Sequence, residues 1–247
     1  MPLYQSDAFV IRTYKLGETD QIVVFFTRDF GKLRAVARRS HSPRRHTASY
    51  YQPLMLLHAI LFGRPTQALY RINAVDVVQS FRPLHEDFGY LRCGLYMTEL
   101  LDATTHEREP MPELFTLFQL ALEQLPQVPY PTLLLRLFEL RLLMVIGYAP
   151  QLVYCARCAG DIQPHERTFS PSLGGLLCTA CAPQVRQTLT MSPATLEYLQ
   201  LAIAHEADDI PLQSLELAAQ QELEHVLHLH LTARLGHELK SYAFLHL

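Results

Sequence analysis

The chain has 247 residues, of which 49% are hydrophobic and 18% are charged. This composition is typical of a globular chain that buries a core, and it excludes an intrinsically disordered protein. The most apolar stretches, residues 54–62 and 133–146, are shorter than the roughly 20 residues of a membrane span. The first residues carry no basic region followed by an apolar run. We therefore expect a soluble, cytoplasmic protein without membrane contact.

The net charge of −3 hides an asymmetry along the chain. Residues 1–80 contain 11 Lys and Arg against 5 Asp and Glu, a net charge of +6, whereas residues 81–247 carry −9. Because a polyanion is attracted to positive potential, any nucleic acid is expected to bind the first third of the chain.

The first 80 residues predict five β-strands, because β-branched and aromatic runs alternate there with turn signals such as Gly63-Arg64-Pro65. The predicted strands cover residues 4–14, 21–27, 33–39, 54–62 and 67–81. Five strands in so short a segment fit a small β-barrel, and an OB-like fold is the five-stranded choice that we predict.

The third predicted strand has a basic face. Lys32, Arg34 and Arg38 share one parity, whereas Leu33 and Ala35 have the other, so the apolar face is expected on the core and the basic face in water. A loop without acids follows, and it contains Arg39, Arg44 and Arg45.

Aromatic residues flank these cations. Arg12 and Tyr14 on the first strand, with Tyr50 and Tyr51 after the loop, could add charge and stacking rings. Cations interleaved with aromatics favour single-stranded nucleic acid, which needs phosphate neutralisation and stacking. The alternative is a solvated strand face beside a flexible loop.

From about residue 84 the apolar period becomes helical. Helices are predicted from 84 to the prolines at 110 and 112, and over 113–125, 133–146, 192–205 and 212–239. Because residues 133–146 are apolar nearly all round, they are expected at the centre of a helical bundle. The last segment contains His225, His228, His230 and His237, which we interpret as exposed polar positions.

Four cysteines carry the strongest motif. Cys155, Cys158, Cys178 and Cys181 form the pattern C-x2-C-x19-C-x2-C. Two residues between thiolates let one turn direct both sulfurs at a single ion, and two such turns complete a tetrahedron without an open position for water. The spacing predicts one structural Zn²⁺ in an insertion at residues 154–183, with two disulfides as the alternative. The fifth cysteine, Cys93, is expected in the core.

The sequence contains no phosphate-binding loop, no dinucleotide fingerprint and no nucleophile elbow. Neither a nucleotide cofactor nor catalysis is therefore predicted.

Three stretches of the chain resemble the RecO family of bacterial recombination mediators. The first consists of IRTYKLGETD at 11–20 and TRDFGKLRAVA at 27–37, the second of LL at 142–143 and IGYAPQL at 146–152 before Cys155, and the third of FSP at 169–171 and GG at 174–175. These stretches span most of the chain in the right order, so the resemblance is specific.

The resemblance implies an N-terminal OB fold over residues 1–80, a helical domain over residues 81–247, and a zinc knuckle in those members that keep four cysteines. It implies binding of single- and double-stranded DNA, annealing of complementary strands and, with RecR, loading of RecA onto DNA coated by single-strand binding protein (SSB). It also implies a place at the bacterial nucleoid. The DNA contacts carried over to this chain are Lys32, Arg34, Arg38, Arg39, Arg44 and Arg45. Some members bind the acidic tail of SSB, but no motif places that site here.

Two other classes of function compete with this one. In the first, the chain is a protein-interaction scaffold and its basic loop is incidental. In the second, it is a nucleic-acid metalloenzyme that uses the zinc or the histidines.

Overall fold

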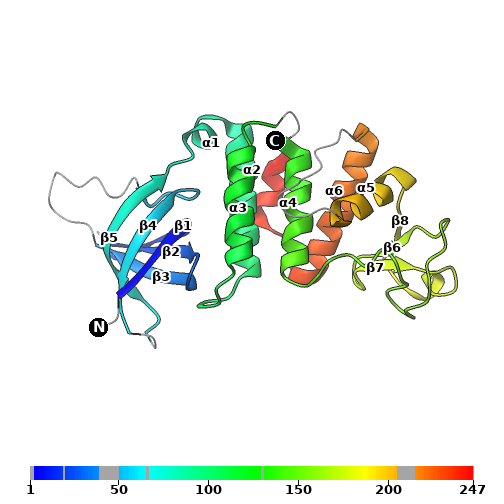
Figure 1. The fold of residues 1–247 in the computed structure, drawn as a ribbon, viewed down its shortest axis with the longest axis horizontal. Coiled ribbons are helices and arrows are strands. Elements are labelled where there is room, and N and C mark those ends of the chain that lie inside the picture. Colours follow the sequence, from blue (N-terminus) through cyan, green and yellow to red (C-terminus); the bar gives the residue numbers. More distant parts are fainter. Residues whose placement is uncertain are drawn as a thin grey trace. The chain divides into compact units, whose positions relative to one another are not determined.

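The computed structural model describes residues 3–18, 20–38, 50–64, 67–128, 131–204 and 215–246. The chain divides into two compact units, the first comprising Met1–Pro126 and Ser241–Leu247 and the second Gln127–Lys240. Figure 1 labels their helices and strands. The boundary predicted at residue 80 coincides with the end of the last barrel strand. That this boundary separates two domains stays a prediction.

The first unit begins with a closed β-barrel in the strand order β1-β2-β3-β5-β4. Its strands are β1 (Leu3–Leu16), β2 (Asp20–Thr27), β3 (Gly31–Ala37), β4 (Leu56–Phe62) and β5 (Tyr70–Gln79). Neighbouring strands are antiparallel except β3 and β5, which pair in parallel through Ala35–Tyr70 and Val36–Arg71. The predicted five-stranded OB-like barrel is thus confirmed.

The barrel interior follows the alternation of the sequence. Val10, Phe25, Leu33 and Ala35 point into it and are fully or almost fully buried. Tyr51 also lies in this core, and only 7% of it is exposed. Its burial raises the pKa of its hydroxyl to about 12. The expectation that Tyr51 offers a stacking ring is therefore wrong.

The outer face of β1 and β2 is buried as well. Phe9 and Phe26 pack there against Phe115 and Phe118 of helix α3 (Pro112–Gln124), with ring centroids 4.8 to 6.0 Å apart. Aromatic pairs at these distances favour the contact beyond the area that they bury. Because both faces of β2 are covered, its run Ile22–Thr27 is apolar at nearly every position and not at alternate ones.

The predicted helix from residue 84 is two helices, α1 (Arg82–Glu86) and α2 (Phe88–Thr104). Asp87 separates them, and its carboxylate accepts a hydrogen bond of 3.0 Å from the backbone N–H of Tyr90, as an N-cap does. Helix α2 ends at Thr104 and not at the prolines.

Residues 105–109 then run beside β3. Glu107 pairs with Lys32 in parallel, and the backbone N–H of Arg108 donates to the carbonyl of Lys32 at 3.1 Å. Because β5 pairs with β3 only at Ala35 and Val36, this segment occupies the edge of β3 that β5 leaves unpaired. We call residues 105–109 the seam segment.

The second unit is helical. It contains α4 (Pro131–Val145), α5 (Pro193–Ala204) and α6 (Leu217–Leu235), with a small sheet in the order β7-β6-β8 formed by Gly175–Leu177, Thr168–Ser170 and Leu189–Thr190. Residues 133–143 of α4 are all buried, as expected of a central helix. Ser192 caps α5, since its hydroxyl accepts from the N–H of Thr195 at 3.3 Å. Within the described part of the chain, no helix has the length and hydropathy to cross a membrane.

The seam segment makes a stability prediction at Gly31. Both Gly31 and Gly17 have positive φ, of 67° and 64°. A Cβ at Gly31 would lie 2.2 Å from the carbonyl oxygen of Glu109, whereas a Cβ at Gly17 would meet nothing within 4 Å. Gly17→Ala should therefore cost only the left-handed strain of about 1–2 kcal/mol. Gly31→Ala should cost roughly 3 kcal/mol or more, because the seam segment must also move.

Urea unfolding of the two variants measures this difference. Equal losses of unfolding free energy would show that the seam segment does not constrain β3.

Candidate metal centre and candidate nucleic-acid interface

The four cysteines of the C-x2-C pairs converge. The Sγ atoms of Cys155, Cys158, Cys178 and Cys181 all lie within 4.8 Å of one another. All four thiols are free, so the disulfide alternative does not hold. Cys155 and Cys181 are buried, whereas Cys158 is exposed. Four thiolates at this separation fit a tetrahedral metal ion, and the four cysteines are positioned to bind one.

Backbone hydrogen bonds shape each cysteine turn. In the first turn the N–H of Ala159 donates to the carbonyl of Cys155 at 2.9 Å, and in the second the N–H of Cys181 donates to the carbonyl of Cys178 at 3.0 Å. The N–H of Ala156 donates to Leu176 of β7 at 2.8 Å. Since β7 leads directly into the second turn, this bond holds the two turns together across 19 intervening residues.

The electrostatics of the cluster favour a cation. Burial raises the pKa of Cys155, but the N–H groups of Cys178, Cys158 and Arg157 outweigh it and lower the pKa to about 6. The pKa of Cys181 is instead raised to about 12, first by its hydrogen bond with Cys178 and then by burial. One thiolate therefore forms readily at neutral pH while another is opposed. A bound cation would stabilise the further thiolates and release their protons.

Glu166 supports the second turn and was not identified from the sequence. Its Oε1 accepts hydrogen bonds from the backbone N–H of Thr179 at 2.7 Å and from its hydroxyl at 2.9 Å. Its Oε2 accepts from the N–H of Gln163 at 2.8 Å. These bonds, that from Gln163 first, lower the pKa of Glu166. Glu166 could not be identified from the sequence, because the cysteine spacing does not show which carboxylate is buried beside the second turn.

Helix α6 holds the loop between β6 and β7. His230 is only 1% exposed, and its Nε2 and Nδ1 lie 2.9 Å and 3.3 Å from the carbonyl oxygens of Tyr148 and Pro171. Burial lowers the pKa of His230. The expectation of an exposed position is therefore wrong for His230, whereas His225 and His237 are exposed as predicted.

Arg234 completes this attachment. Its Nη2 donates to the carbonyls of Ser172 at 2.7 Å and Pro171 at 3.2 Å, and its guanidinium lies 5.5 Å from the centroid of the Tyr148 ring. Gly174 lies close to both side chains, since a Cβ there would be 2.9 Å from Cε1 of His230 and 3.0 Å from Nη2 of Arg234. The stretches around 148 and 171–175 thus connect the metal site to α6 and supply no ligand.

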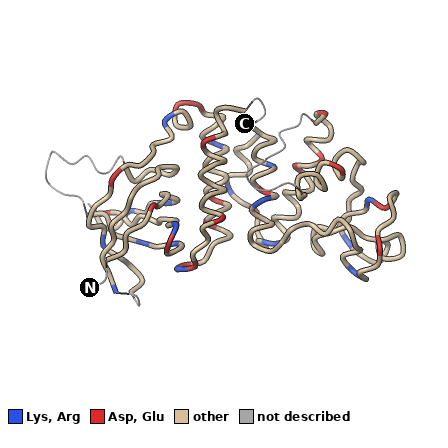
Figure 2. Tube along the Cα trace, viewed as in Figure 1, with Lys and Arg blue, Asp and Glu red and all other residues tan. Residues whose placement is uncertain are grey.

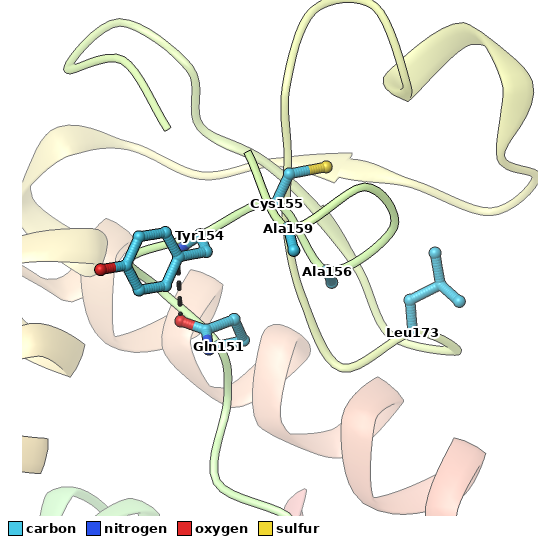
Figure 3. A pocket seen from close by; sticks show the side chains of 6 residues that line it. All are labelled: Gln151, Tyr154, Cys155, Ala156, Ala159 and Leu173. Carbon is cyan, nitrogen blue, oxygen red and sulfur yellow. Dashed lines mark hydrogen bonds between the residues drawn. The ribbon is translucent and has the colours of Figure 1, made fainter. Parts of the chain in front are cut away.

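An open pocket of about 380 Å³ adjoins the first cysteine turn (Figure 3). It is lined by Gln151, Tyr154, Cys155, Ala156, Ala159 and Leu173. The side-chain oxygen of Gln151 accepts from the N–H of Tyr154 at 3.2 Å. The pocket therefore lies directly beside the metal site, with which it shares Cys155.

The second candidate site is the outer face of β1, β2 and β3. Directly opposed residues of neighbouring strands point to the same side. The register gives three rows, which are Phe9–Phe26–Lys32, Arg12–Val24–Arg34 and Tyr14–Ile22–Val36. The first row lies against the helices of this unit. The later rows approach solvent, where Tyr14 is 43% exposed.

Lys32 differs from its predicted position in water. Its side chain is only 11% exposed, and its Nζ contacts the Oδ1 of Asp102 at 2.9 Å and the carbonyl of Asp102 at 2.7 Å. Asp102, near the end of α2, also pairs with Arg12. The alternation along β3 is right, but the face that it defines is covered at this end by α2.

Arg34 and Arg38 are more accessible. The side chain of Arg34 is 54% exposed and contacts Oε1 of Glu107 at 2.5 Å. Arg38 is exposed at the end of β3. In Figure 2, Lys and Arg segments of the barrel lie close to Asp and Glu segments on its helix side. Arg39, Arg44 and Arg45 lie outside the described residues.

Tyr14 is held beside Arg12. The Nη1 of Arg12 donates to the Tyr14 hydroxyl at 3.0 Å, and its guanidinium lies 5.7 Å from the ring centroid. A cation, an exposed ring and the neighbouring Arg34 are the elements with which a protein contacts a phosphate and an adjacent base.

An OB-like barrel followed by helices with a four-cysteine metal site defines the class of this protein. Two family models match the chain, Recombination protein O N terminal over residues 1–81 and Recombination protein O C terminal over residues 85–243. The chain therefore belongs to the RecO family of DNA repair proteins, as its motifs indicated.

Curated relatives agree with this assignment. The DNA repair protein RecO of Symbiobacterium thermophilum is 34% identical over 249 residues, covering 99% of this chain and 97% of that protein. That of Anaeromyxobacter sp. strain K is 35% identical over 190 residues, covering 77% and 75%. That of Pelotomaculum thermopropionicum is 31% identical over 245 residues, covering 99% and 94%.

The metal site predicts that one ligand is needed for both metal binding and stability. Cys178→Ser should reduce bound metal from about one ion per chain to nearly none and lower Tm by roughly 10 °C, because metal binding contributes to folding. Metal analysis and thermal unfolding measure both effects. Cys93→Ser is the matched control and should retain the metal. A metal-free Cys178→Ser protein with unchanged Tm would contradict a structural role.

Glu166 predicts a pH-dependent contribution to stability. Because its pKa is lowered in the folded protein, its stabilisation is complete above the unfolded pKa of about 4.3 and is lost as pH falls through the folded pKa. Glu166→Gln should therefore lower Tm at neutral pH, and the difference from native protein should vanish in acid. Glu197→Gln on α5, which is exposed, should show no difference at either pH. A pH-independent loss would assign the effect of Glu166 to packing.

Proposed function

We propose that this protein is a recombination mediator in DNA repair. It binds single- and double-stranded DNA, anneals complementary strands and, with RecR, promotes loading of RecA onto SSB-coated DNA. It does so without covalent catalysis, at the nucleoid in the bacterial cytoplasm. The observation that carries the proposal is membership of the RecO family over nearly the whole chain, together with a net charge of +6 on residues 1–80.

The DNA-binding surface that we propose is the open end of the outer face of β1–β3. Arg34 and Arg38 would neutralise phosphates there, and Tyr14 would stack on a base beside Arg12. Arg39, Arg44 and Arg45 would extend the surface. Lys32 would add to the positive potential more than make contact, since its amine is paired with Asp102. Contacts to phosphates carry no sequence information, so binding would be largely independent of sequence.

Charge neutralisation explains how such a surface anneals strands. Cations on the first strand lower the electrostatic repulsion that opposes a second strand, and stacking on a ring leaves base edges accessible. No nucleotide hydrolysis is needed for either effect. Contacts with RecR, RecA and the SSB tail are proposed from the family, without assigned residues.

We propose that the metal is one structural Zn²⁺. Four thiolates are the soft ligand set that favours zinc, and they would leave no coordination position for substrate or water. The ion would fix the two cysteine turns to each other and, through β6 and β7, to α6.

A scaffold function remains the second candidate, because a specific observation favours it. Two of the proposed DNA-binding cations, Lys32 and Arg34, already form ion pairs with Asp102 and Glu107, so their charge is partly neutralised within the protein.

Fluorescence anisotropy of a labelled mixed-sequence single strand across a salt titration tests the proposed surface. Arg34→Ala/Arg38→Ala should weaken binding and reduce the slope of log K against log salt by about 1.4, roughly 0.7 for each lost phosphate contact. Arg82→Ala is the control, since Arg82 is an exposed cation of the same unit, paired with Glu86 on α1. The rate of annealing of complementary strands should fall in the double variant and not in the control. A shallow slope in every protein would favour the scaffold function.

A further inference from the structure

The outer face of β1–β3 has two ion pairs that differ in burial. Lys32 and Asp102 have side chains that are 11% and 16% exposed, whereas those of Arg34 and Glu107 are 54% and 39% exposed. The inner pair is also fixed by a second bond, from Nζ of Lys32 to the backbone carbonyl of Asp102. In the outer pair, Nη2 of Arg34 lies 2.5 Å from Oε1 of Glu107, and both side chains face solvent.

The position of Glu107 beside Arg34 is set by the backbone. The seam segment pairs with β3 through Glu107 and Lys32, and the N–H of Arg108 donates to the carbonyl of Lys32 at 3.1 Å. The guanidinium of Arg108 donates to the carbonyl of Gln67, just before β5. The segment is thus anchored at β3 and near β5. This places the carboxylate of Glu107 beside Arg34, on a side chain that is 39% exposed to solvent.

We propose that Glu107 competes with DNA phosphate for Arg34 and thereby limits the affinity of this face for DNA. In the DNA-free protein its carboxylate occupies the guanidinium, and a phosphate of bound DNA displaces it. The inference rests on the proposed DNA-binding face and names the group that sets the affinity of that face. Carboxylate and phosphate accept the same fork of N–H donors from a guanidinium, so Arg34 serves one of them at a time with full geometry.

The burial of each pair determines which carboxylate can leave. An exposed ion pair shifts an equilibrium by no more than about fivefold, so a polyanion that contacts several cations can displace it. Separating Lys32 from Asp102 would leave a largely buried charge without its partner, which is far more costly. Glu107 therefore exchanges with phosphate, and Asp102 holds Lys32 and Arg12 in place.

The competition has two measurable consequences. Glu107 repels an approaching phosphate, and its ion pair with Arg34 has to break before a phosphate binds the guanidinium. Substituting Glu107→Gln should tighten binding of a labelled single strand by roughly three- to fivefold at low salt. The slope of log K against log salt should stay nearly unchanged, because Arg34 contacts a phosphate in both complexes.

Glu109→Gln is the matched control. It removes the same charge from the same seam segment, and Glu109 forms no ion pair with the residues that the structure describes. Its effect on affinity should stay below about twofold at the same salt concentration, because it changes the net charge without releasing Arg34. In an Arg34→Ala background, Glu107→Gln should have no greater effect than this control, because the competed cation is gone.

Anisotropy salt titrations test the competition in the native protein, the three single variants and Arg34→Ala/Glu107→Gln. Urea unfolding checks that each variant keeps its fold. Glu107→Ala serves as a second variant if the glutamine retains a hydrogen bond to Arg34. If Arg34→Ala weakens binding but neither Glu107 variant binds more tightly than Glu109→Gln, the competition is overturned and the DNA-binding face stands. If Arg34→Ala leaves binding unchanged, the DNA-binding face itself fails, and the competition with it.

Discussion

The contact of Phe9 and Phe26 with Phe115 and Phe118 makes the outer face of the barrel part of the hydrophobic interior of the first unit. Strands that are buried on both faces cannot present a basic surface along their whole length. The exposure of the cations on this face therefore increases with their distance from the four phenylalanines. Lys32, in the row of Phe9 and Phe26, is paired and largely buried, whereas Arg34, one row further, keeps contact with solvent. The area of this face that a polyanion can reach is what α2 and α3 leave uncovered.

The second unit follows a comparable logic around its four cysteines. The four sulfurs would contact the metal, but they are brought together by other groups that are not ligands. Glu166 holds the second turn, β7 joins the turns, and His230 with Arg234 attaches their loop to α6. Such outer contacts orient ligands and adjust their affinity for a metal. A substitution in any of them would reach the site through geometry and leave the donor set intact.

Sequence reasoning succeeded where the signal is local. Alternation along β3, turn residues between strands and the cysteine spacing each act within a few residues, and they predicted the barrel, most helices and the metal cluster. It failed where the burial of a residue depends on segments that are distant in the sequence. Lys32 is covered because Asp102 and α2 lie over it, and nothing near residue 32 signals this. Tyr51 is buried although it lies in an irregular segment, where no periodic pattern predicts burial. His230 is buried although the polar residues around it on α6 indicate exposure.

The seam segment bears on how the chain is made. Translation delivers all five strands before Thr105–Glu109 and α3, so when β5 leaves the ribosome one edge of β3 still lacks its partner. Phe26 of β2 and the part of Phe9 that contacts α3 meanwhile stay uncovered until Phe115 and Phe118 emerge, about forty residues after β5 ends. Unpaired edges and exposed aromatics are the features that make nascent intermediates prone to aggregate. Between these two points of synthesis, the nascent chain therefore carries both features at once.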